Sequence, residues 1–208
     1  MENLTYCLAK SQKEKKEALF LVEKEYIKQD YIDPKNSDCK LEISKFSATF
    51  VAKLNGKVAG TVSIVFDSES GLPMDDIYKD ELEKFRNSNK KIVEVCRLAT
   101  DNDFLKNSGV FDKKRNSLSL LISLFKLVFH YSIYKNIDYI CISINPKHDL
   151  FYKSLGFEDI GGLKYYPSVN NAPALAKAIR IDELKTKNKK SLIGNLLWKN
   201  PPEYKMFK

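Results

Sequence analysis

The 208-residue chain has few of the residues from which metal sites, disulfide frameworks and membrane spans are built. Its four cysteines are scattered without a Cys-x-x-Cys pair and it has only two histidines, so the sequence predicts no metal site and favours free thiols in a reducing compartment. No apolar export signal is present in Met1–Lys16. The longest apolar stretch, Leu118–Ile133, is too short and too often interrupted by polar residues to span a bilayer. These absences predict a cytoplasmic protein.

The chain also has little excess of positive charge outside its C-terminal end. The formal net charge is +8, and the seven lysines and two glutamates of Glu183–Lys208 supply +5 of it. The remaining +3, and the absence of a basic helix interleaved with aromatic residues, argue against nucleic acid as a partner. A mildly basic surface favours an acidic protein or an anionic membrane surface instead.

The length and composition are those of one domain with a sizeable core, since 43% of the residues are hydrophobic and 30% are charged. No internal repeat and no linker divides the chain. We therefore expect a single domain over residues 1–182 and a basic tail over residues 183–208. Within the tail, Leu192–Trp198 is a possible amphipathic helix, which can lie on a membrane, pack over the domain or form an oligomer contact.

Apolar periodicity and turn residues predict alternating strands and helices. Ser11 and Glu14 have the spacing of a capping box, and Asn55-Gly56 favours a type I′ hairpin turn. The sequence predicts strands at Thr5–Ala9, Ala48–Leu54, Lys57–Phe66, Lys91–Ala99, Tyr139–Ile144, Phe157–Gly161, Leu163–Tyr166 and Ala174–Ile181. It predicts helices at Gln12–Lys28, Asp75–Phe85, Ser117–Lys135 (capped by Asn116 or Ser117) and Lys147–Leu155, with a loop at Thr100–Arg115.

The strand Lys91–Ala99 is the most informative part of the sequence. It is apolar and β-branched, yet it contains Glu94 and Arg97. A charge inside a core is costly unless it is paired or has a function, so the strand either has a solvated edge or carries a functional site. In a regular strand Glu94 and Arg97 point to opposite faces, and a bulge would change that.

Several segments resemble a known family. The run from Phe151-Tyr152 to Gly156-Phe157 is similar to a signature of the GNAT acyltransferase superfamily. Further short runs resemble the long-chain N-acyl amino acid synthases: Gly60–Ser63, Asp67-Ser68, Gly71–Pro73, Glu81-Leu82, Phe85-Arg86, Val93–Ala99, Tyr166-Pro167 and Asn171–Ala174. Glu25-Tyr26 and Asp30-Tyr31 match them more loosely. The Glu-x-x-Arg of the central strand is similar to that of the acyl-homoserine-lactone (autoinducer) synthases. The resemblance implies an α/β (α+β) GNAT acyltransferase fold with a mixed central sheet flanked by helices.

The loop after the central strand departs from the pattern of acetyl-CoA enzymes. Those enzymes have a Gln/Arg-x-x-Gly-x-Gly/Ala loop whose N–H groups hold the pyrophosphate of CoA. Here Asp101–Arg115 contains a single glycine, Gly109. This difference favours a donor on the phosphopantetheine arm of an acyl carrier protein, with a CoA thioester as the alternative, and no permanently bound cofactor.

The resemblance implies transfer of a long acyl chain from a thioester to the amine of a small acceptor such as an amino acid, and it suggests a role for several residues. Glu94 is the expected base, Arg97 orients the acceptor or Glu94, and Tyr152 protonates the leaving thiolate. Each also has a structural alternative: a salt bridge for the two charges and packing for the tyrosine. The acyl-donor or phosphopantetheine site is expected at Leu98, Ala99, Thr100, Asn145 and His148.

A basic cluster follows the central strand and can meet an acidic carrier protein. It consists of Lys106, Lys113, Lys114 and Arg115, although such runs are often only solvated. The sequence therefore predicts a cytoplasmic N-acyltransferase that uses acyl carrier protein, and it leaves open a peripheral membrane contact through the C-terminal tail. The alternatives are an acetyl-CoA-dependent N-acetyltransferase and a non-catalytic lipid- or acyl-carrier-binding protein of the same fold.

Overall fold

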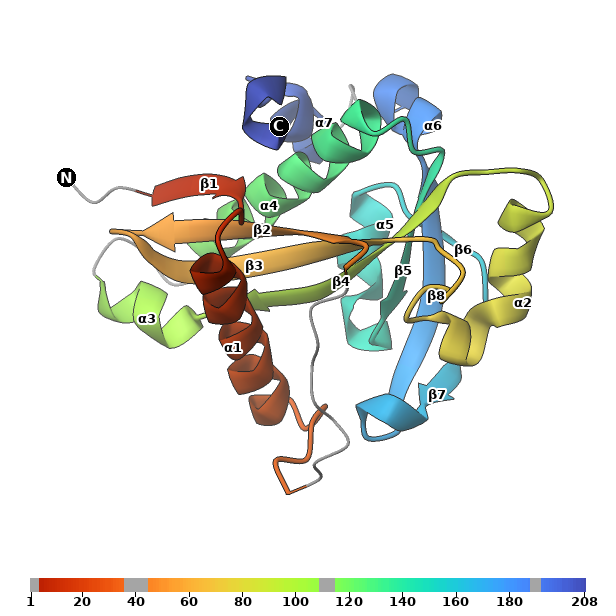
Figure 1. Cartoon of the computed structure of the whole chain (residues 1–208), viewed down its shortest axis with the longest axis horizontal. Helices are drawn as coiled ribbons and strands as arrows, with labels where there is room; N and C mark the ends of the chain where they lie inside the picture. Colours follow the sequence, from red (N-terminus) through yellow and green to blue (C-terminus); the bar gives the residue numbers. More distant parts are fainter. Residues whose placement is uncertain (1–3, 36–44, 109–114, 188–191) are drawn as a thin grey trace.

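The computed structural model describes residues 4–35, 45–108, 115–187 and 192–208, in which one mixed sheet lies between two layers of helices (Figure 1). The strand order is β1-β2-β3-β4-β5-β8-β6, with β7 paired to β8. The pairing of β4 with β5 is parallel and the other pairs are antiparallel. The strands are β1 (Leu4–Leu8), β2 (Ser47–Leu54), β3 (Lys57–Phe66), β4 (Ile92–Thr100), β5 (Tyr139–Ile144), β6 (Glu158–Asp159), β7 (Lys164–Tyr166) and β8 (Ala172–Arg180).

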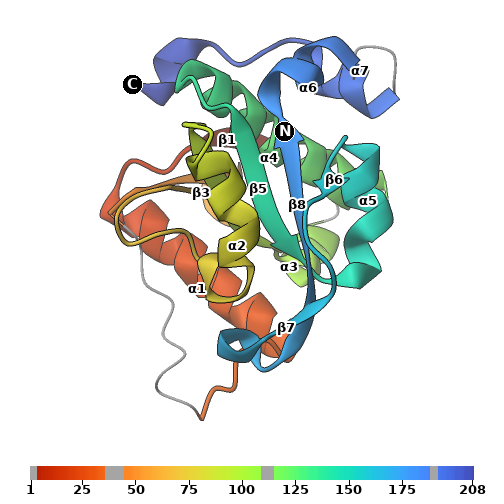
Figure 2. The same cartoon turned by 90° about the vertical axis from the view of Figure 1, so that its right-hand side faces the viewer.

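Helices α1 and α2 cover one face of the sheet, and α4 and α5 cover the other (Figure 2). The helices are α1 (Gln12–Lys28), α2 (Asp75–Arg86), α3 (Asn102–Asn107), α4 (Arg115–Tyr134), α5 (Asp149–Ser154), α6 (Ile181–Lys187) and α7 (Leu192–Trp198), with short 3-10 turns η2 (Pro146–His148), η3 (Pro167–Val169) and η5 (Tyr204–Phe207).

The larger part of the core lies under α4, which is apolar on nearly all sides as its sequence suggests. Phe50, Phe125 and Ile140 are fully buried there. On the opposite face, Ala18 and Val22 of α1 pack over β2 to β4. With apolar side chains on both faces, the central strands are buried on both sides, and a charge placed on them must find a partner or a cavity.

Local sequence signals predicted several elements well. Ser11 accepts a hydrogen bond from the backbone N–H of Glu14, whose side chain accepts from the N–H of Ser11, so the capping box is present. Asn55 and Gly56 both have positive φ, as the two-residue turn between β2 and β3 requires. The expected bounds of α1 and β5 match the structure.

Other expectations about local structure were wrong. Part of the expected loop after β4 is the helix α3, because the Asp101 side chain accepts from the N–H of Phe104 and caps it. Asn116 and Ser117, expected as caps, lie inside the described range of α4 (Arg115–Tyr134). The chain also continues directly from β8 into α6, which the sequence pattern did not indicate.

The C-terminal tail packs on the domain (Figure 1). Leu197 and Phe207 are buried, and the Trp198 ring lies against His130 of α4 with ring centroids 5.2 Å apart. The side chains of Leu192 and Ile193, which were expected on a lipid-facing surface, lie outside the described residues. None of the helices in the described part of the chain is both long and apolar enough to cross a membrane.

The hairpin turn offers a test of this fold. Gly56 has a φ of +83°, and an added Cβ at this position meets no atom within 4 Å, so substitution strains only the backbone. We expect Gly56→Ala to lower the free energy of unfolding by about 1–2 kcal/mol in urea denaturation. Gly162→Ala is the matched control, since that site is equally open and has no left-handed φ, and it should change stability by less than about 0.5 kcal/mol. Equal effects of the two substitutions would contradict this explanation.

Candidate active site

The main cavity lies where β4 and β5 separate. The two strands form only three residue pairs, of which Glu94 with Cys141 is the last, and beyond this point they diverge (Figure 1). The space between them has a volume of about 480 Å³, which is typical of a small-molecule site. Both strands, the end of α1, the start of α2, the first turn of α5 and the segments around η3 contribute side chains to its wall.

A bulge in β4 brings two charged side chains to this cavity. Thr61 and Ser63 of β3 face Ala99 and Cys96, so β4 contains one extra residue between these pairs. Arg97 lies in the bulge with a φ of +56°, a left-handed conformation that is uncommon for a residue other than glycine. The extra residue changes the alternation of the strand, and Arg97 lines the same cavity as the glutamate three residues before it.

Glu94 is the most deeply buried acid at the site, with 3% of its surface exposed. One carboxyl oxygen accepts a hydrogen bond of 2.7 Å from the backbone N–H of Met74. Burial raises the pKa of Glu94 to about 8; the Met74 N–H lowers it, and the nearby charge of Asp75 raises it further. A carboxyl group with such a pKa can accept a proton near neutral pH, as a general base must.

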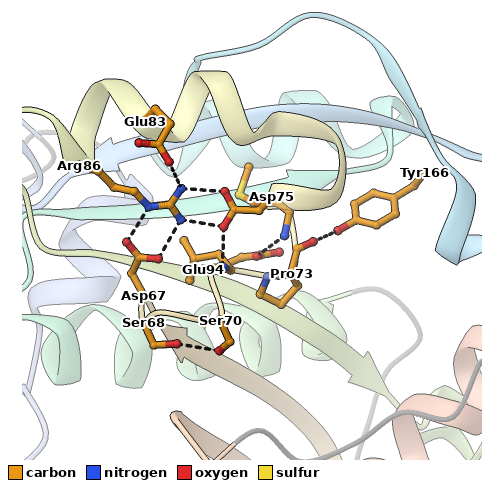
Figure 3. Close-up of polar contacts among 11 residues, drawn as sticks. Asp67, Ser68, Ser70, Pro73, Asp75, Glu83, Arg86, Glu94 and Tyr166 are labelled. Atoms are coloured by element: carbon orange, nitrogen blue, oxygen red, sulfur yellow. Dashed lines mark hydrogen bonds and ion pairs between the residues drawn. The ribbon is translucent and has the colours of Figure 1, made fainter.

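Arg86 fixes the segment that contacts Glu94 (Figure 3). Its guanidinium forms two bonds of 2.8 Å with Asp67 and bonds of 2.8 and 2.7 Å with Asp75, and a fifth bond of 3.0 Å reaches Glu83. Two bidentate pairs of this kind hold both carboxylates in a defined orientation. Because Met74 lies next to Asp75 in the chain, Arg86 sets the position of the N–H group that reaches Glu94.

Arg97 borders the main cavity and a second cavity of about 10 Å³ beside Thr49 and Ser63, whose hydroxyl oxygens are 2.9 Å apart. Within the described residues, the Arg97 guanidinium has no ion pair or hydrogen bond with another side chain. Its guanidinium is half-buried and retains its donors for an anionic group. The structure thus places Arg97 where it can bind a carboxylate beside Glu94.

Tyr152 of α5 lies at the wall of the cavity and is 6% exposed. Its ring contacts Phe125 and Phe157 edge-on, with centroid distances of 5.8 Å for both. Burial raises the pKa of Tyr152, and the neighbouring Tyr31 raises it further, so the phenol keeps its proton at neutral pH. A protonated phenol at this position can donate a hydrogen bond.

Three of the five residues expected at the donor site line the cavity: Leu98, Asn145 and His148. Burial and the charge of Lys147 lower the pKa of His148, which favours a neutral imidazole. Ala99 and Thr100 pair with β3 and lie outside the described lining. Their assignment to the donor site stays a prediction.

The basic cluster expected to meet a carrier protein is only partly described. Lys106 is exposed on α3. Lys113 and Lys114 lie outside the described residues, and Arg115 begins α4 without a described side chain. The positions of these groups relative to the cavity therefore remain a prediction.

Sequence reasoning gave no role to several lining residues. Tyr26, Tyr31, Tyr166 and Asp76 all border the cavity. The Tyr166 hydroxyl donates to the carbonyl oxygen of Pro73 (Figure 3). Tyr26, Tyr31 and Tyr166 lie within runs that carry the family resemblance, and that resemblance could have identified them as site residues. Asp76 lies in none of these runs.

Cys96 also lines the cavity, next to Glu94. Burial raises the pKa of its thiol to about 12, and the Glu94 charge raises it further, so the thiol stays protonated. Among the described residues, no group of three His, Cys, Asp or Glu side chains could hold a metal ion. The acids, phenols and guanidinium at the cavity are the groups available for proton transfer and charge stabilisation.

Comparison with known proteins agrees with this geometry. The family model described as N-acyl amino acid synthase FeeM matches residues 17–180. The solved structure of FeeM, an N-acyl amino acid synthase from uncultured soil microbes, is 35% identical to the chain with a TM-score of 0.78. That match covers 94% of this chain and 99% of FeeM. Comparison with curated protein sequences found no match.

More distant structures show the shared fold. The acyl-homoserine-lactone synthase LasI has a TM-score of 0.56 at 13% identity, over 87% of this chain and 90% of LasI. An N-acetyltransferase from Staphylococcus aureus Mu50 has a TM-score of 0.52 at 13% identity, over 88% of this chain and 99% of the other. The mixed sheet is thus the GNAT acyltransferase fold that the sequence predicts. Together with the match to FeeM, this shows that the chain belongs to the FeeM N-acyl amino acid synthase family of N-acyltransferases.

Proposed function

We propose that the chain transfers a long-chain fatty acyl group from an acyl carrier protein to the amine of an amino acid or a similar small acceptor. One observation carries this proposal: the buried Glu94 carboxyl group faces a cavity that opens where β4 and β5 separate. Arg97 lies in the same cavity. A proton acceptor and an anion-binding group are thus side by side where an amine with a carboxylate could be held.

The divergence of the strands supports a thioester donor. Because pairing between β4 and β5 ends at Glu94, the backbone groups of β4 beyond it on this edge have no strand partner from β5. The amide groups of a phosphopantetheine arm can pair with such an edge. The thioester would then lie next to Glu94, and the acyl chain would continue between the apolar side chains of Leu98 and Ile142.

The segment after β4 supports a carrier protein over CoA. Its first part is the helix α3 and not a glycine-rich loop, and the sequence through Arg115 contains one glycine. A CoA donor needs a binding site for its pyrophosphate, whereas the phosphopantetheine arm of a carrier protein contains no pyrophosphate. The exposed Lys106 on α3 adds positive charge on this segment, which suits an acidic partner.

The chemistry then follows from the groups at the cavity. Glu94 takes a proton from the acceptor amine, and the amine nitrogen attacks the thioester carbon. Backbone N–H groups near Leu98, Ala99 and Thr100 stabilise the oxyanion of the tetrahedral intermediate. Its collapse breaks the C–S bond, and Tyr152 donates its proton to the sulfur so that a thiol leaves. The products are an amide and the free pantetheine thiol of the carrier.

Arg97 is the group we assign to the acceptor carboxylate. Replacing Arg97 with Gln should raise the KM for the amino acid by about 10- to 100-fold, since a charge-assisted hydrogen bond contributes about 1.5–3 kcal/mol. The KM for the acyl donor should change by less than about twofold. Steady-state kinetics with each substrate varied in turn measure both values. A change in the donor KM alone would assign Arg97 to the other substrate.

The donor and acceptor are tested directly with purified protein. Acyl carrier proteins loaded with acyl chains of several lengths, the matching CoA thioesters and acetyl-CoA are each supplied with a panel of amino acids, and the products are identified by mass spectrometry. We expect N-acyl amino acids from the long-chain carrier thioesters. Organic extracts of cells that express the chain should contain the same products.

Two results would overturn the proposal. Turnover of acetyl-CoA without use of the carrier thioesters would indicate an N-acetyltransferase. Binding of acyl carrier protein without any amide product, under conditions where FeeM is active, would indicate a non-catalytic binding protein of the same fold.

A further inference from the structure

Two lysines and two aspartates outside the cavity lining form a closed ring of alternating charge. Lys177 of β8 is 0% exposed, and its ammonium group lies 2.5 Å from Asp149 and also contacts Asp159. Lys153 completes the ring, 2.8 Å from Asp149 and 3.7 Å from Asp159. The two lysines and two aspartates alternate in sign and cancel in charge.

The ring joins three elements that are far apart in the sequence. Asp149 and Lys153 belong to α5, Asp159 to β6 and Lys177 to β8, and Figure 2 shows α5 and β6 beside β8. The sequence around Lys177 is otherwise apolar, and Ile179 on the same face belongs to the core. A lysine buried in such surroundings must be paired, and here it is held by both aspartates.

Stability alone explains this arrangement poorly. A buried ion pair is often no more stabilising than apolar side chains of similar size, because removing the charges from water costs about as much as their attraction returns. What such a ring does provide is a fixed geometry. Helix α5 has only six residues, and a helix of that length depends on tertiary contacts for its position.

The part of α5 that the ring fixes is the part that reaches the cavity. Asp149 is the first residue of α5. Tyr152, three residues later, lies on the same side of the helix and lines the cavity. We infer that Lys177 is a positioning residue, which holds the hydroxyl group of Tyr152 at the acyl-transfer site by anchoring the first turn of α5. The effect of Lys177 on catalysis rests on the proposed function. Its effect on the position of the Tyr152 side chain does not, and it can be measured without substrate.

The kinetic test replaces Lys177 with Met, which has a similar length and no charge. Asp149 keeps its contact of 2.8 Å with Lys153, and the side chain of Asp159 is 52% exposed, so neither carboxylate is left without a partner or water. Circular dichroism of the variant checks that the fold persists. We expect kcat to fall about tenfold, because a small misplacement of a reacting group is enough for such a loss. The KM values should change by less than about twofold. Lys53→Met is the matched control: it removes a largely buried lysine of β2 that is paired with Glu14 of α1, lies outside the cavity lining and has no contact with α5, and it should leave kcat within about twofold.

A double-mutant cycle separates positioning from general damage. If Lys177 acts through Tyr152, the substitution Lys177→Met should cause no further loss of kcat once Tyr152 has been replaced by Phe. The same tenfold loss in both backgrounds would overturn the inference, and so would a wild-type kcat in the Lys177→Met variant. A wild-type kcat in the Tyr152→Phe variant would instead contradict the catalytic role given to Tyr152.

A spectroscopic measurement tests the positioning without turnover. The chain is labelled with 3-fluorotyrosine, and the 19F resonance of Tyr152 is identified as the one lost in the Tyr152→Phe variant. We expect Lys177→Met to shift or broaden this resonance while that of the distant Tyr204 is unchanged, and we expect Lys53→Met to leave it in place. An unchanged Tyr152 resonance in Lys177→Met would overturn the inference even if acyl transfer is confirmed.

Discussion

Replacing Glu94 with Gln should lower kcat by about 10²- to 10⁴-fold, the contribution typical of a general base. The amide has the shape of the protonated carboxyl group and keeps an oxygen that can accept the 2.7 Å hydrogen bond from Met74. The change therefore removes the proton acceptor and little else. Measurement of kcat with saturating donor and acceptor gives the effect directly.

The pH dependence gives this prediction a second signature. Burial raises the pKa of Glu94 to about 8, so most molecules carry the inactive, protonated form at pH 7. The rate of the wild-type protein should rise about tenfold per pH unit well below that pKa and level off above it. In Glu94→Gln this rise should disappear.

Glu81→Gln is a suitable control. Glu81 pairs with Lys164 at 2.8 Å, is also largely buried and lies outside the cavity lining. Its replacement should lower stability and leave kcat and the pH profile unchanged. If Glu94→Gln retained activity within about threefold of the wild type, the assignment of Glu94 as the base would be wrong, since general base catalysis is worth far more.

The same pKa shift has a consequence for stability. The folded protein binds a proton at Glu94 up to about pH 8, whereas the unfolded chain releases it near 4.5. The stabilisation from this proton is therefore complete below about pH 4.5 and is lost as the pH rises through 8. Because Gln does not titrate, the free energy of unfolding of Glu94→Gln minus that of the wild type should increase from pH 5 to pH 9. Urea denaturation at several pH values checks this sign.

The sequence predicted those parts of the fold that depend on neighbouring residues. The capping box at Ser11 and Glu14 and the turn at Asn55-Gly56 are local devices, and the structure contains both. A charged pair in an apolar strand was likewise a sound indication of a cavity, because a buried charge needs a reason to be there. Glu94 and Arg97 do line the same cavity.

What the sequence could not predict depends on contacts between distant segments. The family resemblance implied a bulge in the central strand, but its position at Arg97 is visible only in the register with β3. Arg86 and Asp67 are 19 residues apart and meet only after α2 folds back beside the sheet. Lys177 and Asp149 meet through a strand and a helix packed together. The family resemblance included Asp67 and Arg86, but nothing in the sequence showed that they pair with each other.

Arg86 illustrates the point, because its role depends entirely on such distant contacts. Arg86→Lys keeps the positive charge but cannot form two bidentate pairs with Asp67 and Asp75, as a single ammonium group lacks the planar fork. The three side chains are about one-fifth exposed, so we expect a loss of about 2–3 kcal/mol in the free energy of unfolding. Urea denaturation measures this loss.

Arg86→Lys should also affect the active site, because the pairs of Arg86 with Asp67 and Asp75 hold the segment that carries Met74. The Met74 N–H lowers the pKa of Glu94, so a displaced N–H should move the midpoint of the pH–rate profile upward from about 8 in Arg86→Lys. The charge at position 86 is unchanged, so this shift reports geometry. Glu83→Gln removes only the contact with the more exposed Glu83 side chain and should alter neither stability nor midpoint. If Arg86→Lys kept the wild-type midpoint despite lower stability, Arg86 would support the fold of α2 without positioning the N–H group at Glu94.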